Sequence, residues 1–223
     1  SSALLQSRDT RKNKQNINYL SGYPTSTLVN AGNISYWARD DGFSGRNPYD
    51  NGGGVIFPRG TASCVYADGI VWGGRVHDTI SPVIRVGGGT YNTGTQRGAI
   101  LPGGIPESLS SSSVRIYRIR KDWQIADLRQ DAAEINLIPT SAVTNEQIAQ
   151  VRLQYEKDWN EWPWQKGAPF YDANHNGIKE SFEEPGIANA TQVVWLVGND
   201  LDSNKTNGLY GSPSIGLEVQ FTF

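Results

Sequence analysis

Gln192-Val-Val-Trp-Leu-Val-Gly198 is an almost wholly apolar run near the C-terminal end of the sequence. A strand that is buried on both faces has this composition, because neither of its two rows of side chains meets water. The run therefore predicts the central strand of a sheet.

The last nine residues, Ile215 to Phe223, have a different pattern, in which apolar and polar or small residues alternate. Alternation with a period of two places one row of side chains against a core and the other in solvent. This predicts a half-buried strand. Because the pattern continues to the last residue without a turn, we expect that the natural chain continues or that this strand pairs with another segment. The apolar row consists of Ile215, Leu217, Val219, Phe221 and Phe223.

The composition supports a mainly β fold. Among 223 residues there are 25 Gly, 7 Trp and 10 Tyr, whereas charged residues make up only 19%. Such a mixture favours short strands, tight turns and large aromatic anchors. We expect an antiparallel β-sandwich-like domain with one or two helices and long loops. Residues 1–32 are predicted to be an extended N-terminal arm, and residues 33–223 a single β-rich domain with a helical insertion at about 121–162.

The first half of the predicted domain contains a hairpin signal. Thr61 to Tyr66 and Ile70 to Val76 are apolar runs on either side of Ala67-Asp68-Gly69. An Asp-Gly pair between two such runs favours a tight turn, because both residues tolerate positive φ. We therefore expect these runs to pair with each other, and the lone Cys64 to be a small core residue.

The helical insertion has clear boundaries. After a short helix predicted from about Ile125 to Ile135, Thr144 and Gln147 have the spacing of a capping box, and Pro163 ends the helix that follows. Four apolar or aromatic residues fall on one face of that second helix at helical spacing, and three Trp residues cluster at its end. We expect the cluster to pack the helix onto the sheet; the alternative is a sugar-stacking platform. The face consists of Ile148, Val151, Tyr155 and Trp159, and the cluster of Trp159, Trp162 and Trp164.

The charge balance and hydropathy exclude two classes of partner. Lys and Arg number 20 against 22 Asp and Glu, a net charge of −2, so no basic excess is present to bind nucleic acid. No apolar run is long enough to span a bilayer. The sequence contains no Met, which we interpret as the mark of a processed product, such as a mature secreted protein.

The segment Asp172-Ala-Asn-His-Asn-Gly-Ile-Lys-Glu-Ser-Phe-Glu183 has the spacing of an EF-hand-type calcium loop. Calcium requires six to eight oxygen ligands, and alternate residues of a tight loop supply them from one side. Gly177, at the sixth position, permits the sharp turn. The predicted ligands are the side chains of Asp172, Asn174, Asn176, Glu180 and Glu183 and the main-chain carbonyl of Ile178.

Two departures from the EF-hand pattern indicate a structural site rather than a calcium switch. The apolar Ile178 is at position seven instead of eight, and Pro169 lies too close for a helix to enter the loop. With Asn at two ligand positions the charge of the site is low, which favours modest affinity and a calcium-rich extracellular fluid. The alternative is a solvated turn rich in Asn, Asp and Gly.

Catalytic groups are sparse. The two His residues, His77 and His175, and the single Cys64 are far apart and supply neither a Ser-His-Asp triad nor a zinc site. Five acidic residues are candidates for the paired carboxylates of a glycoside hydrolase, but the sequence does not select two of them. We therefore expect the chain not to be an enzyme. The candidates are Asp40, Asp41, Glu134, Glu161 and Glu218.

Six further motifs, together with the calcium-type loop, resemble the N-terminal region of large secreted surface proteins from bacteria with type IX secretion. The resemblance covers residues from about 33 to 223. It implies an extracellular location and a place in a longer multidomain protein. The motifs are Phe57-Pro-Arg-Gly-Thr61, Asp68-Gly-Ile-Val-Trp-Gly-Gly74, Val114-Arg-Ile-Tyr-Arg-Ile119, Asp127-Leu-Arg-Gln-Asp-Ala132, Asp158-Trp-Asn-Glu-Trp-Pro-Trp-Gln-Lys-Gly-Ala-Pro169 and Leu209-Tyr-Gly-Ser-Pro-Ser-Ile-Gly-Leu-Glu218.

Two functions remain open at this stage. The first is a non-catalytic structural or adhesive module at the cell surface, stabilised by calcium, that self-associates or binds other domains of the same protein, as a filament or surface-layer building block does. The alternative is a carbohydrate-binding module or a fragment of a secreted glycoside hydrolase, for which a glycan is the ligand.

Overall fold

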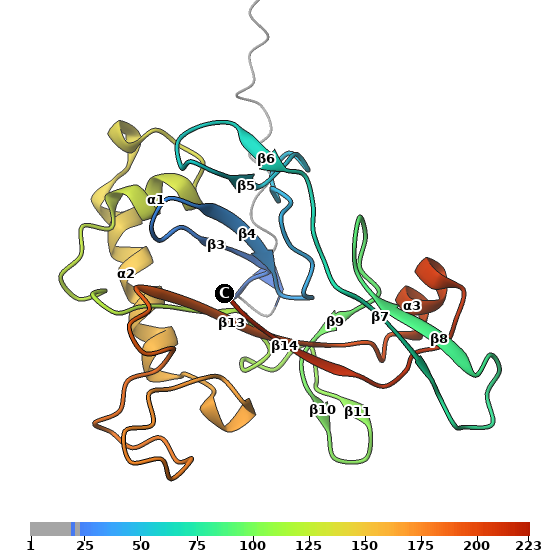
Figure 1. Ribbon diagram of the computed structural model, residues 1–223. Coiled ribbons are helices and arrows are strands. Elements are labelled where there is room, and N and C mark those ends of the chain that lie inside the picture. The colour runs from blue at the N-terminus through green and yellow to red at the C-terminus, as the bar shows by residue number, and fades with distance from the viewer. Residues whose placement is uncertain (1–18, 21–22) are drawn as a thin grey trace, which may run out of the picture.

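The computed structural model describes residues 19–20 and 23–223 of the chain. Antiparallel sheets dominate it, and the helices lie to one side of the central strands and at one end of the molecule (Figure 1). The predicted fold class, a mainly β, sandwich-like domain with a helical insertion, is confirmed.

The central sheet is built around β13 (Gln192–Asn199), every residue of which is buried. β13 pairs with β12 (Tyr117–Arg120) on one side and with β14 (Glu218–Thr222) on the other, and β9 (Gln96–Arg97) adds to its far end. The apolar run thus forms the predicted central strand. The final strand pairs inside the chain, on β13.

A second sheet has the strand order β3-β4-β5-β6 and packs against one face of the first. The layer between them contains Ala38 from the second sheet and Ile116, Val194 and Leu196 from the central sheet and the segment that leads into it. Phe221 and Phe223, from the apolar row of the final segment, cover this layer. The four strands are β3 (Ser26–Val29), β4 (Ser35–Arg39), β5 (Val55–Ile56) and β6 (Ser63–Val65).

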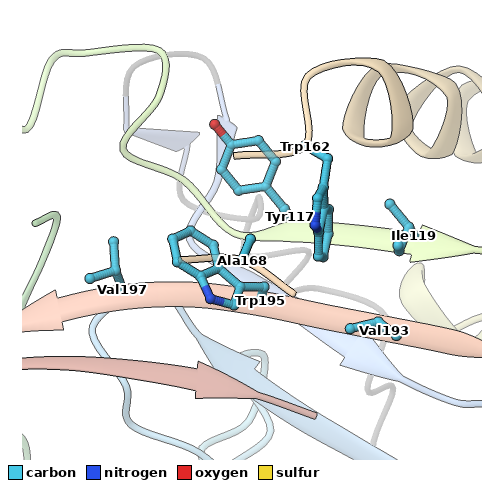
Figure 2. Packing of buried hydrophobic residues seen from close by; sticks show 7 residues of the cluster. All are labelled: Tyr117, Ile119, Trp162, Ala168, Val193, Trp195 and Val197. Carbon is cyan, nitrogen blue, oxygen red and sulfur yellow. The ribbon is translucent and has the colours of Figure 1, made fainter. Parts of the chain in front are cut away.

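The opposite face of the central sheet carries an aromatic cluster (Figure 2). Trp162 approaches Tyr117 edge to face, with ring centroids 6.3 Å apart, and Tyr117 in turn contacts Trp195 at 6.1 Å. Trp159 and Trp164 pack against the same cluster. The prediction that the Trp residues pack the helix end onto the sheet is confirmed. The buried members are Tyr117, Ile119, Trp162, Ala168, Val193, Trp195 and Val197.

The helical insertion contains α1 (Arg129–Ile135), which begins later than predicted, and α2 (Asn145–Asn160), with the short 3₁₀ turns η2 (Thr140–Ala142) and η3 (Trp164–Lys166). Both bonds of the predicted capping box are present: Gln147 N donates to Thr144 Oγ1 at 3.2 Å, and Thr144 N donates to Gln147 Oε1 at 2.9 Å. Val151 and Tyr155 are buried, as the periodicity predicts.

The predicted hairpin between residues 61–66 and 70–76 is wrong. β6 pairs with β5, and β7 (Val71–Arg75) pairs with β8 (Ile84–Gly88) instead. Asp68 is held by the hydroxyl groups of Tyr36 and Ser44, so the Asp-Gly pair carries the chain from one sheet to another. Cys64, predicted to lie in the core, is exposed because β6 is an edge strand.

The arm predicted at 1–32 falls largely outside the described residues, and its last part belongs to the fold. β1 (Tyr19–Leu20) pairs with β2 (Tyr23–Pro24), and β3 is a buried strand of the second sheet. Two further elements were not predicted from the sequence. They are the hairpin of β10 (Ile100–Leu101) with β11 (Ile105–Pro106), and α3 (Ser203–Tyr210).

Candidate functional site

The loop Asp172–Glu183 lies between η3 and β13, and its ends are joined. Phe170 and Pro185 form an antiparallel bridge, and Tyr171 N donates to the carbonyl oxygen of Glu184 at 2.9 Å. The loop therefore leaves and rejoins the body of the protein at one point.

Asp172 organises the first half of the loop. Its carboxylate accepts hydrogen bonds from the main-chain nitrogens of Asn176, at 3.2 Å, and Gly177, at 2.8 Å. The turn needs positive φ at two residues, +59° at His175 and +74° at Gly177. Glycine adopts such angles without strain. The predicted role of Gly177 is therefore supported by the geometry.

Three predicted ligands meet at the carboxylate of Glu180. The side-chain amides of Asn174 and Asn176 donate to Glu180 Oε1 at 3.2 and 2.7 Å. The hydrogen bond from Asn176, helped by the one from Asn174, lowers the pKa of the Glu180 carboxyl. Its second oxygen, Oε2, is shielded from solvent and has no hydrogen-bond partner among the residues that the structure describes. A shielded carboxylate oxygen without a donor is suited to a cation.

Glu183 links the two halves of the loop through its carboxylate. It is only 3% exposed, and its two oxygens accept hydrogen bonds from Ala173 N at 2.7 Å and Glu180 N at 3.1 Å. A buried carboxylate held by main-chain amides on both sides of the loop fixes the distance between the two halves. The prediction that Glu183 binds calcium through both oxygens stays a prediction.

The chemical types of the predicted ligand atoms suit a hard cation. Carboxylate and amide oxygens are available from Asp172, Asn174, Asn176 and Glu180. A flip of an Asn side-chain amide places its oxygen where its nitrogen lies, so the two Asn residues can turn an oxygen toward a cation. The Ile178 side chain is exposed, while its main-chain nitrogen donates to Asn176 Oδ1 at 2.7 Å. Among residues 19–20 and 23–223, no three His, Cys, Asp or Glu side chains are grouped to hold a metal, so the Asn residues are essential to the candidate site.

A second candidate is a polar cleft of about 470 Å³ between β3, the end of β4 and β9. It brings together Asp40 and Asp41, two of the five acidic residues considered for glycoside hydrolysis. Glu134, Glu161 and Glu218 lie elsewhere, on α1, at the end of α2 and on β14. Cationic side chains that line the cleft are Arg39, Arg46, Arg97 and Lys205.

Both carboxylates of the cleft are buried and paired with Arg. Arg97 donates to Asp40 at 2.9 Å, and Arg39 donates to Asp41 through Nε at 3.2 Å. Burial, with a contribution from the neighbouring Asp41, raises the pKa of Asp40 to about 6. Arg97 and Lys205 are far from Asp40 in the sequence, and no local pattern links them, so the cleft could not be predicted.

No protein-family model, curated protein or solved structure matches this chain. Within the described part of the chain, the helices are too short or too polar to cross a membrane.

Proposed function

We propose that the chain is a non-catalytic structural module of an extracellular surface protein, stabilised by calcium bound in the loop Asp172–Glu183. The observation that carries the proposal is the shape of the loop, because five side chains predicted to be ligands are held around one turn by hydrogen bonds within the loop.

Calcium would act on the core through the segment that follows the loop. Pro185 and Gly186 are buried where this segment approaches β12 and β13, and a Cβ atom added at Gly186 would lie 2.8 Å from Ile119 and 3.1 Å from Val193. Because the path leaves no room for displacement, ordering the loop also fixes the approach of the chain to β13.

The charge of the loop explains why a cation would stabilise it. Asp172, Glu180 and Glu183 place three mutually repelling negative charges in this one loop, in which Lys179 is the one cationic side chain. A bound divalent cation offsets this repulsion. A site of modest affinity is filled in extracellular fluid, which agrees with the surface location that the resemblance implies.

The test is thermal unfolding of the purified chain with excess calcium and with a chelator. We expect a higher thermal midpoint with calcium, since a ligand that binds only the folded state stabilises it. Glu180→Gln removes a ligand charge and should abolish most of the calcium-dependent shift. Asp202→Asn, which retains a good N-cap for α3, is the matched control and should respond as the wild type does. A wild-type midpoint unaffected by chelation contradicts the proposal.

The second candidate function is glycan binding or hydrolysis in the polar cleft, favoured by the placement of Asp40 beside Asp41. A carboxyl with a pKa near 6 can act as a general acid, and paired carboxylates flank the bond in most glycoside hydrolases. The ion pairs with Arg97 and Arg39 give both carboxylates a structural role as well.

A glycan array and a panel of chromogenic glycosides distinguish these roles. Binding or turnover that is lost in Asp41→Asn, with the thermal midpoint retained, supports the glycan function. An absence of both binding and turnover excludes the glycan function and leaves the structural module as the proposed function.

A further inference from the structure

β14 has one edge that no described strand covers. Val194 and Phe223 exchange both main-chain hydrogen bonds, at 3.1 and 3.0 Å, so the residues that point toward β13 are the odd-numbered ones. Antiparallel strands alternate in this way, so the N–H and C=O groups of Glu218, Gln220 and Thr222 point away from the sheet. All three residues are exposed, and their main chains have no hydrogen-bond partner in the described structure.

β7 has a second open edge. Val76 N donates to the carbonyl oxygen of Val83 at 2.8 Å, so the even-numbered residues of β7 point toward β8. The N–H and C=O groups of Val71, Gly73 and Arg75 therefore point outward, and these residues are exposed. The outer edge of β8 is different, because Ser212 Oγ is hydrogen-bonded to both Val86 N and Val86 O.

The two open edges are chemically complementary. Natural edge strands are usually protected by Pro, Lys, bulges or inward-pointing charges. Neither Val71-Trp-Gly-Gly-Arg75 nor Glu218-Val-Gln-Phe-Thr222 contains Pro or Lys, and each carries one charge, of opposite sign. Glu218 retains acceptor capacity, because within the described residues its carboxylate accepts hydrogen bonds from Ile100 N at 2.7 Å and from the Gln220 amide at 3.2 Å and no others.

We propose that β14 of one copy of this chain pairs antiparallel with β7 of a second copy. The register places Arg75 of β7 opposite Glu218 of β14, Gly73 opposite Gln220, and Val71 opposite Thr222. Each of these three pairs exchanges two main-chain hydrogen bonds, because all six residues present their N–H and C=O groups at an open edge. The central sheet of one molecule then continues into the β7–β8 ribbon of the next.

The match at each position supports this register. Arg75 and Glu218 lie directly opposite each other in this register and form a salt bridge. Opposite charges at such positions stabilise a strand pair, and like charges destabilise it. Gly73 has no side chain and leaves room for Gln220. Val71, which is 48% exposed, would gain Thr222 of the other copy as a directly opposite neighbour.

Pairing between two different edges is a heterologous contact, which forms a ring when the rotation between copies closes. A heterologous contact whose rotation does not close generates a filament. The inference rests on the proposed structural function and supplies its partner, a second copy of the same chain. A symmetric contact between two β14 strands is the competing arrangement; centred on Gln220, it places Glu218 opposite Thr222 and forms no salt bridge.

Sedimentation velocity of the full chain over a range of concentrations, with calcium present, tests the contact. We expect the wild type to form oligomers that grow with concentration. Arg75→Glu and Glu218→Arg should each weaken association about tenfold, because each replaces an attractive pair by a repulsive one. An equimolar mixture of the two variants should associate as the wild type does, since each restores the pair with the other. Glu156→Arg, on the exposed face of α2, changes the net charge as Glu218→Arg does and should have no effect on association.

Several results overturn the inference. The first is a wild type that stays monomeric at the highest concentration. The second is normal association of the single variants. The third is a mixture that does not recover association although both variants unfold at the wild-type temperature. If Glu218→Arg weakens association, Arg75→Glu does not, and mixing the two variants restores nothing, the contact is the symmetric one between two β14 strands. A monomer whose thermal midpoint still rises with calcium contradicts the assembly contact but not the calcium-stabilised module.

Discussion

At the scale of single residues, buried charge is neutralised by partners that come from distant segments. Asp158 of α2 is 1% exposed and forms an ion pair with Arg115. It also accepts hydrogen bonds from Arg118 N and from Gln154 Nε2, each at 2.9 Å. Asp158 thus fastens α2 to β12 and to the residues before it. The helical periodicity predicts which apolar residues of α2 face the sheet, but it contains no information about this carboxylate.

Removing Asp158 should be costly, because it takes a buried acidic partner away from Arg115, whose side chain is itself buried. We expect Asp158→Ala to lower the free energy of unfolding by about 3–5 kcal/mol, the cost of breaking a buried pair. Asp122→Ala removes the exposed partner of Arg120 and should cost less than about 1 kcal/mol. Chemical denaturation of both variants measures the difference; equal costs would contradict the structural role of Asp158.

Asp40 should make the stability of the fold depend on pH. Its pKa is about 6 in the fold against an ordinary value of 3.8, so the folded state holds the proton more tightly than the unfolded state does. This contribution to stability is complete below about pH 4 and is lost as the pH rises through about 6. Asp40→Asn does not titrate, so its stability relative to the wild type should rise between pH 4 and pH 7, by about 3 kcal/mol. A difference that stays constant over that range contradicts the raised pKa.

At the scale of elements, the sequence predicted those whose signals are local. The apolar run of β13, the alternation of the last segment and the capping box of α2 each depend on neighbouring residues, and the structure confirms all three. The hairpin around Asp68 failed because strand pairing is decided at long range. A Cβ at Gly69 would lie 2.0 Å from the carbonyl oxygen of Gly89, so this glycine is needed for a close approach of two segments.

The capping box gives a prediction at this scale. Thr144→Ala removes the side chain that accepts the hydrogen bond from Gln147 N and should lower the free energy of unfolding by about 1 kcal/mol. Thr144→Ser retains a hydroxyl and is the matched control, for which we expect little change. Urea denaturation distinguishes the two; equal stability of both variants would show that the cap contributes nothing.

At the scale of the whole molecule, single side chains join segments that the sequence cannot relate. Asp200 is fully buried and accepts hydrogen bonds from the main-chain nitrogens of Ile215, Gly216 and Leu217, at 2.7 to 2.9 Å. This carboxylate anchors the segment that leads into β14, and no local sequence pattern indicates that role. The polar cleft was missed for the same reason, since Asp40 and Arg97 meet only after folding.

The loop Asp172–Glu183 is the opposite case, because all the calcium ligands predicted for it lie within one short segment. Spacing alone predicted which side chains share the turn, and the structure brings Asn174, Asn176 and Glu180 into contact. Spacing could not predict that Glu183 is buried against main-chain amides, because that depends on how the loop packs.

Calorimetric titration of the full chain with calcium tests the central claim most directly. We predict one binding site per chain, with modest affinity as expected for two Asn ligands, and tighter binding in Asn176→Asp because that variant adds an anionic ligand. Glu180→Gln should weaken binding. If the wild type takes up no calcium at millimolar concentration, or if uptake is unchanged in both variants, the loop is not a calcium site.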